Sequence, residues 1–176
     1  MLGPVDGDAL AVTVEAIGEP GKRRFRLMAI VGGDTHIVWM EKQQVQALGL
    51  ALEQVLDRLP DSGPTFEPSG MGAAYDTDSR YQFRAGRMEL GYEERQNRLS
   101  VVAHDLDSGG DEGTLTVRIS RRQARELSET AAAVVSAGRP ICPLCSLPMG
   151  PGPHVCAGQN GHLPEHLDED DFEAEA

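Results

Sequence analysis

Two stretches of the chain, 79 residues apart, carry the same pattern of a strand that runs directly into an amphipathic helix. Residues 38–48 read VWMEKQQVQAL and residues 117–127 read VRISRRQAREL, and they are identical at their first, seventh and eleventh positions. Apolar residues recur at spacings of three and four in both, which predicts one buried stripe on each helix. The predicted stripes are Val45, Leu48, Leu52, Val55 and Leu59, then Ala124, Leu127, Ala131, Val134 and Gly138.

Three strand candidates precede each helix. They span residues 11–17, 24–31 and 35–40 in the first half, and residues 81–92, 98–105 and 114–119 in the second. Gly32-Gly33-Asp34 predicts a tight hairpin, and residues 106–113 are its longer counterpart. We therefore expect an α+β fold of tandem β-β-β-α repeats, with an antiparallel sheet packed by two helices. The first repeat would span residues 1–60, a linker residues 61–79, and the second repeat residues 80–139.

Residues that end a helix follow both predicted helices, but a clear N-cap precedes only the second. Ser120 followed by Gln123 forms a capping box at the start of the second helix, and Gly138 with Pro140 ends it. Pro60 ends the first helix, which lacks a comparable N-cap.

Alternation along the strands assigns a buried face and an exposed face. The residues expected to pack beneath the helices are Phe25, Leu27, Ala29, Val31, Val38, Met40, Leu99, Val101, Ala103, Leu115, Val117 and Ile119. The outer face would carry Arg24, Arg26, Trp39, Arg84, Arg98, Thr116 and Arg118.

All three cysteines lie in one short C-terminal stretch, residues 140–163, together with a histidine. The pattern is C-x2-C-x10-C-x5-H, formed by Cys142, Cys145, Cys156 and His162. Two thiolates two residues apart form a knuckle whose backbone N–H groups turn toward the sulfurs, and a second pair closes a zinc tetrahedron. Proline and glycine dominate the intervening residues, so a metal rather than an apolar core would hold them. We predict a zinc-ribbon-like segment.

His154 competes with His162 for the fourth position. A separation of five residues from Cys156 lets both side chains bend onto one ion, whereas a His-x-Cys pair in extended chain points its members to opposite sides. This favours His162. A redox pair or plain buried thiols are the alternatives for the two closely spaced cysteines. A redox CxxC usually opens a helix after a strand, whereas here Pro148 and a run of glycines and prolines follow within a few residues.

Four protein ligands leave no open position for water or substrate, which indicates a structural metal rather than a catalytic one. Glu15, Glu89, His104 and Asp105 are available acid–base groups, but no spacing joins them into a catalytic constellation. We therefore expect a protein that is not an enzyme.

The net charge of −12 is unevenly distributed. Residues 164–176 contribute seven of the 28 acidic residues, and without them 21 acidic and 16 basic residues leave −5. This tail is predicted to be a disordered, solvated extension that aids solubility. The alternatives are that it attracts a basic partner or mimics a phosphate backbone.

The sequence places the protein in the cytoplasm. No stretch is long and apolar enough for a membrane span, and residues 1–11 lack the features of a signal peptide. Cysteines confined to one end of the chain favour metal ligation in a reducing compartment over a disulfide framework.

The predicted outer face is basic and holds the single tryptophan. Arginines around an exposed aromatic ring are typical of sheets that bind single-stranded nucleic acid. The candidate residues are Arg24, Arg26, Trp39, Arg84, Arg98 and Arg118. The alternative is an ordinary polar face, its arginines paired with carboxylates and Trp39 covered by the linker or a second protomer. The negative charge of the body favours that alternative.

Several motifs together resemble a family filed as a domain of unknown function and known mainly from actinobacteria. They are residues 18–21 (GEPG), 41–45 (EKQQV), 83–88 (FRAGRM) and the stretch from CPLC at 142–145 to NGH at 160–162. The resemblance covers nearly all of the chain before the acidic tail. It implies a cytoplasmic bacterial protein, and no reaction, substrate or cofactor. Strands feeding a helix in tandem are also similar in topology to transcriptional-coactivator and plastid "whirly" single-strand DNA binders.

These observations lead to one expected function and one alternative. The expected function is that of an adaptor or regulatory protein without enzymatic activity, whose structural zinc site and acidic tail present a protein-binding surface. Its partner is an unidentified protein, and a homodimer is possible. The alternative is a protein that binds single-stranded nucleic acid on the Arg/Trp39 face.

Overall fold

The computed structural model describes residues 4–60, 72–108, 114–137, 142–147, 149 and 156. The chain divides into two compact units, Met1–Gly138 and Arg139–Ala176. The predicted acidic tail lies outside the described residues. The first unit contains β1 (Val5–Ile17), β2 (Arg24–Val31), β3 (Asp34–Met40), α1 (Lys42–Arg58), β4 (Gln82–Glu93), β5 (Arg98–Asp105), β6 (Leu115–Ile119) and α2 (Arg121–Ser136).

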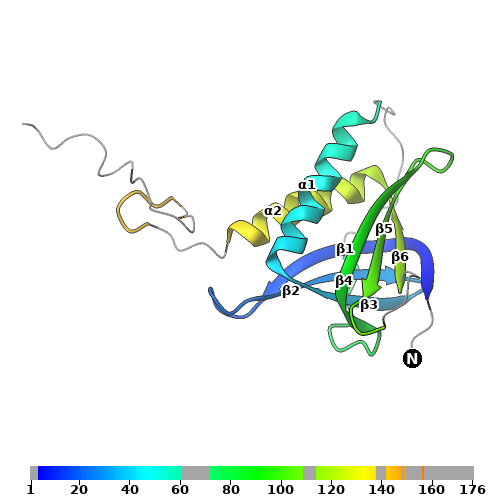
Figure 1. Ribbon diagram of the computed structural model, residues 1–176, viewed down its shortest axis with the longest axis horizontal. Coiled ribbons are helices and arrows are strands. Elements are labelled where there is room, and N and C mark those ends of the chain that lie inside the picture. Colours follow the sequence, from blue (N-terminus) through cyan, green and yellow to red (C-terminus); the bar gives the residue numbers. More distant parts are fainter. Residues whose placement is uncertain are drawn as a thin grey trace, which may run out of the picture. The chain divides into compact units, whose positions relative to one another are not determined.

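The six strands form a closed barrel in the order β1 to β6, and α1 and α2 cross each other on one side of it (Figure 1). Consecutive strands within each half pair antiparallel. The halves join through two parallel pairs: β3 with β4, where Trp39 lies opposite Arg84, and β6 with β1, where Arg118 lies opposite Asp8.

The mixed α+β class is confirmed, whereas the prediction of an antiparallel sheet with a helix-covered face and an open face is wrong. Parallel strands need a long crossover, and α1 supplies it between β3 and β4. The strand twist then brings β6 back to β1, so the sheet closes and its inner face becomes the inside of a barrel. Alternation along a strand identifies the buried face but carries no information about closure.

The core confirms the predicted inner face. All twelve residues assigned to it belong to one buried cluster, to which both helices also contribute. From α1 the buried residues are Val45, Leu48, Gly49 and Leu52, and from α2 they are Ala124, Leu127, Ala131 and Val135. One continuous core therefore holds both halves together, because neither half encloses its apolar residues alone.

The same glutamine begins both helices. The Oε1 atoms of Gln44 and Gln123 accept from the backbone N–H of Glu41 and Ser120 at 2.8 and 2.9 Å. The capping box predicted at Ser120 is thus confirmed, and Gln44 forms a capping box with Glu41 at the first helix, which the sequence pattern did not predict. Each glutamine also donates its Nε2 to two carbonyls of the neighbouring parallel strand: Gln44 to residues 85 and 86 of β4, and Gln123 to residues 9 and 10 of β1.

These carbonyls lie at irregularities of the barrel. The pairing register shifts between Ala85 and Met88 in β4 and between Ala9 and Ala11 in β1. A bulge leaves backbone groups without ladder partners, and the part-buried carbonyls of Ala85 and Ala9 take the glutamine Nε2 as their donor. Each glutamine therefore ties the start of a helix to a strand bulge.

The two helices meet at a small residue. A Cβ at Gly49 would lie 3.0 Å from the Cβ of Ala131, so only a glycine admits this approach without displacement. The Ser128 hydroxyl donates to the Gly49 carbonyl at 2.9 Å. Within the described residues, neither helix has the length and apolarity that crossing a membrane requires.

Candidate metal centre

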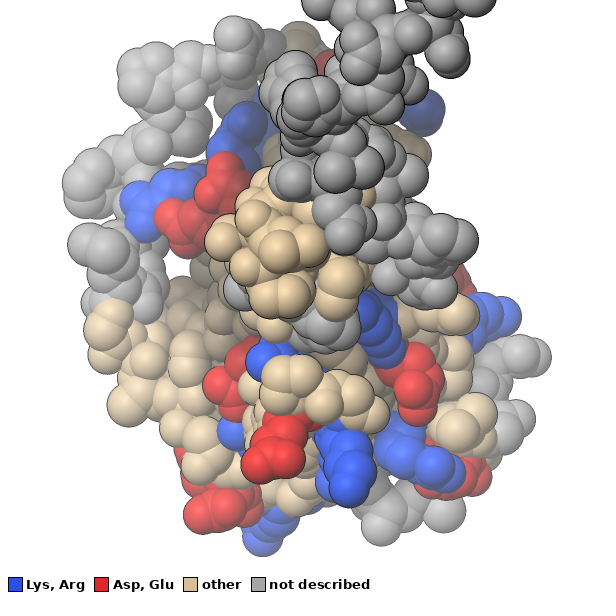
Figure 2. Space-filling model, turned by 90° about the vertical axis from the view of Figure 1, so that its left-hand side faces the viewer, with Lys and Arg blue, Asp and Glu red and all other residues tan. Residues whose placement is uncertain are grey.

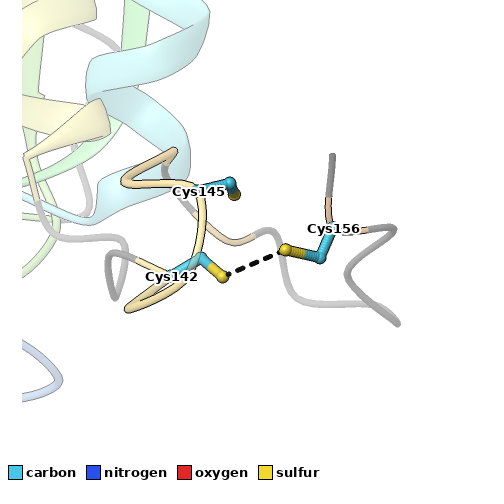
Figure 3. A group of neighbouring side chains, drawn as sticks. All are labelled: Cys142, Cys145 and Cys156. Carbon is cyan, nitrogen blue, oxygen red and sulfur yellow. Dashed lines mark hydrogen bonds between the residues drawn. The ribbon is translucent and has the colours of Figure 1, made fainter. Parts of the chain in front are cut away.

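The second unit brings its three cysteine sulfurs together. The Sγ atoms of Cys142, Cys145 and Cys156 all lie within 4.8 Å of one another, and those of Cys142 and Cys156 point toward each other (Figure 3). Cys142 and Cys156 are buried, and Cys145 is half-buried. The sequence prediction that these three residues form one cluster is confirmed.

A tight turn places the first two cysteines. Ser146 N–H donates to the Cys142 carbonyl and Cys142 N–H donates to the Leu147 carbonyl, both at 2.9 Å. Ser146 has a φ of 55°, a left-handed conformation that reverses the chain directly after Cys145. The turn therefore holds both side chains on one side.

The sulfur spacing fits a tetrahedral zinc ion. Cys142 Sγ and Cys156 Sγ are 3.7 Å apart. A disulfide would need about 2.05 Å. Two thiolates bound to one zinc at about 2.3 Å with tetrahedral angles lie about 3.8 Å apart. The donor set and its spacing therefore suit a thiolate-bound metal.

The turn also prepares Cys142 as a ligand. Backbone N–H groups of Cys145 and Leu144 point at its sulfur and lower its pKa from 9.0 to about 6, against the smaller opposing effect of burial. Hydrogen bonds to the charged form of an acid favour that form. Because the thiolate is the metal-binding form of cysteine, the turn favours metal binding near neutral pH.

The two candidates for a fourth ligand, His162 and His154, lie outside the described residues. Both remain predictions.

The six residues of the predicted basic face lie around the barrel rather than on one surface. Trp39 is in the middle of a cross-strand row with Arg26 on one side and Arg84 on the other. Arg24 stacks on the Trp39 ring, with its guanidinium carbon 4.1 Å from the ring centroid. Arg98 and Arg118 are on β5 and β6, which follow β4 around the closed barrel.

Carboxylates accompany three of these arginines. Arg26 pairs with Glu15, Arg84 with Asp107, and Arg118 with Asp6 and Asp8. Figure 2 shows basic and acidic side chains interspersed on the face it presents. The predicted basic surface is therefore interrupted by acidic groups.

Arg26 is predicted on the exposed face, but the structure buries it and leaves only 7% of its surface exposed. Its Nη1 donates to the Thr77 carbonyl at 3.2 Å, and its guanidinium lies 5.5 Å from the Trp39 ring centroid. The residue faces outward, but Trp39 and the segment before β4 cover it. Alternation alone does not predict such a cover.

Two of the acid–base groups noted in the sequence meet across β4 and β5. His104 Nε2 lies 2.9 Å from Glu89 Oε1, and Arg87 Nη2 lies 3.0 Å from the same oxygen. His104 is buried, and its Nδ1 has no hydrogen-bond partner among the residues that the structure describes. Strand alternation does not predict this contact, because the bulge at residues 85–88 shifts the register that brings the side chains together.

Comparison with known proteins identifies the family of this chain and assigns no activity to it. Neither the curated proteins nor the solved structures contain a match to the chain. The family model described as "Protein of unknown function (DUF3090)" matches residues 8–156, which include every strand except the start of β1, both helices and all three cysteines. The chain belongs to this family of proteins of unknown function (DUF3090).

Proposed function

We propose that this protein is a bacterial cytoplasmic adaptor or regulatory protein without enzymatic activity, in which a zinc-bound C-terminal segment presents a surface to a protein partner. The cluster of Cys142, Cys145 and Cys156 is the observation that carries the proposal. With His162 as the fourth ligand the site is closed, and a closed thiolate site contributes folding free energy rather than chemistry.

Two leucines in the described part of this segment are exposed to solvent. Leu144 and Leu147 are 63% and 53% exposed, although they flank the cysteines. Contiguous exposed apolar surface marks many protein-interaction sites. In this proposal the metal fixes the turn, and the leucines contact the partner.

The barrel supports the proposal as a scaffold formed by duplication. The two glutamines at the seventh position of the aligned stretches make the same cap and the same pair of strand contacts in both halves. A duplicated unit accounts for this correspondence, since each copy inherits the same helix start. In this proposal the first unit is a scaffold for partner binding and catalyses no reaction.

The experiment compares the full chain with Cys142→Ser/Cys145→Ser as baits in extracts of the native host. The expected result is one metal per wild-type chain and a protein partner that the double variant loses together with the metal. Ser146→Ala is the matched control, because it alters the same turn without removing a sulfur, and it should retain both. A partner list that is the same for all three baits would refute the role of the metal segment.

Nucleic-acid binding is the second candidate, favoured by the arginine stacked on the Trp39 ring. It predicts binding of single-stranded oligonucleotides that weakens steeply with salt and is lost in Trp39→Ala. Fluorescence anisotropy with a labelled oligonucleotide at low and physiological salt measures this. No binding at low salt would eliminate the candidate.

A further inference from the structure

The three cysteines of the cluster differ in their access to solvent. Cys142 and Cys156 are 4% and 5% exposed, whereas Cys145 is half-buried. The susceptibility of a cysteine to oxidation follows the exposure of its sulfur. An oxidant that arrives from solvent therefore meets the Cys145 sulfur first.

The Cys142 sulfur is the common neighbour of the other two. It makes side-chain hydrogen bonds with both Cys145 and Cys156. It lies 3.7 Å from the Cys156 sulfur, and the two point toward each other (Figure 3). Because all three sulfurs lie within 4.8 Å of one another, an oxidised Cys145 has the Cys142 sulfur beside it.

The turn places Cys142 and Cys145 within reach of a disulfide. The Ser146 N–H donates to the Cys142 carbonyl four residues earlier, at 2.9 Å, which closes one helix-like turn. Residues three apart are neighbours on one side of such a turn. A disulfide requires Cα atoms about 4.4–6.8 Å apart. Side-chain rotation is therefore enough to join this pair.

We propose that Cys145 and Cys142 form a reversible oxidation site for hydrogen peroxide, whose reaction releases the metal. The inference rests on the proposed function, since it describes how the zinc-bound segment is regulated. Disulfides of cytoplasmic proteins are usually transient and serve catalysis or redox sensing. Loss of the metal frees the turn that presents Leu144 and Leu147, so oxidation releases the protein partner.

The reaction has two steps. The Cys145 thiolate attacks one peroxide oxygen, the O–O bond breaks, and a sulfenic acid and a hydroxide form. The Cys142 thiolate then attacks the sulfenic sulfur, the S–S bond forms, and the S–O bond breaks to release a second hydroxide. The two sulfurs lose two electrons to the peroxide, and two protons from solvent convert the hydroxides to water.

The disulfide removes two ligands from the metal site. A thiolate binds metal, and neither sulfur of a disulfide is a thiolate. Only Cys156 and the predicted histidine then remain, and two ligands do not hold a structural zinc ion.

Peroxide treatment of the zinc-loaded full chain, purified under reducing conditions, tests the proposal. The chain should release its zinc to a chromogenic chelator, and peptide mass mapping should find a disulfide between Cys142 and Cys145. Dithiothreitol and added zinc should restore the starting state. Zinc that stays bound under peroxide, or a disulfide that includes Cys156, overturns the proposal.

Two matched variants test the order of reaction. Cys145→His and Cys156→His each leave two cysteines and two histidines, a ligand set that structural zinc accepts. Cys145→His should release zinc about 10-fold more slowly than the wild type or slower still, because its remaining sulfurs are buried. Cys156→His keeps the reactive pair and should respond like the wild type. The reverse order of sensitivity overturns the proposal, and the disulfide map of the wild type decides alone for a variant that does not bind zinc.

The zinc content before peroxide is added separates this inference from the proposed function. A chain without zinc at that stage refutes both. A chain with one zinc that peroxide does not release refutes the oxidation site and leaves the structural metal in place.

Discussion

Arg26 and Arg84 flank Trp39 in one cross-strand row, yet their surroundings differ sharply. The Arg26 side chain is 9% exposed and pairs with Glu15, whereas those of Arg84 and its partner Asp107 are 61% and 69% exposed. A buried charge that loses its partner keeps its desolvation cost, and an exposed pair is screened by water.

Removing the acidic partner should therefore have unequal effects at the two sites. Glu15→Ala is expected to lower the free energy of unfolding by about 1–3 kcal/mol, because Arg26 stays buried without its carboxylate. Asp107→Ala should change it by less than about 0.5 kcal/mol. Urea denaturation of both variants measures the difference, and equal effects would show that Arg26 is not held by Glu15.

His36 makes the stability of the barrel depend on pH. Burial lowers its pKa from the ordinary 6.5, against the smaller opposing effects of Asp34 and of a hydrogen bond to the Val31 backbone. The unfolded chain therefore takes up a proton at a higher pH than the folded protein. The stability from the neutral ring is complete above pH 6.5 and is lost as the pH falls through and below that value.

We expect His36→Gln to lose less stability than the wild type between about pH 7 and about pH 5, since glutamine does not titrate. Carboxylates titrate in both proteins, so the difference between the two curves isolates the histidine. Urea midpoints across this range measure it. Parallel curves would mean that His36 keeps its ordinary pKa.

At the level of single residues, the sequence predicts which side of a strand faces the core but not what covers the other side. All twelve predicted core residues are buried, because period-two alternation follows directly from strand geometry. The burial of Arg26 and the contact between His104 and Glu89 depend on a covering segment and on a strand bulge, and alternation encodes neither.

At the start of each helix, one glutamine forms hydrogen bonds to both the helix backbone and a barrel strand. Gln44 and Gln123 each cap a helix and satisfy two strand carbonyls. Gln44→Leu and Gln123→Leu keep much of the side-chain bulk and remove these three hydrogen bonds. Each should lower the free energy of unfolding by about 2 kcal/mol, because the bulge carbonyls lose their donor.

The exposed Gln46 on α1 is the matched control for these variants. Gln46→Leu should change the stability by less than about 0.5 kcal/mol. Chemical denaturation of the three variants provides the comparison. A loss at Gln44 with none at Gln123 would contradict the equivalence of the two helix starts.

At the level of elements, periodicity and end signals locate the strands and helices well. β2 and β5 have the predicted bounds, and α1 ends just before Pro60. β1 begins at Val5, six residues before the predicted start at residue 11. The early part of β1 pairs in parallel with β6, so a partner more than 100 residues away, rather than local propensity, fixes its conformation.

At the level of the whole molecule, the strand arrangement differs most from the prediction. The sequence predicts a sheet with one buried and one exposed face, whereas the six strands form a closed barrel. Closure follows from two parallel pairings between the halves, and no local pattern specifies them. The cysteine cluster was predictable because a metal site constrains residue type and spacing directly, whereas strand pairing depends on the entire fold.

X-ray absorption at the zinc edge of the purified full chain is the most direct test of the central claim, a structural zinc ion bound by Cys142, Cys145, Cys156 and one histidine. The account predicts one zinc per chain, three sulfur ligands at about 2.3 Å and one nitrogen ligand at about 2.0 Å. Protein without zinc, or a disulfide between any two of the three cysteines, would contradict it.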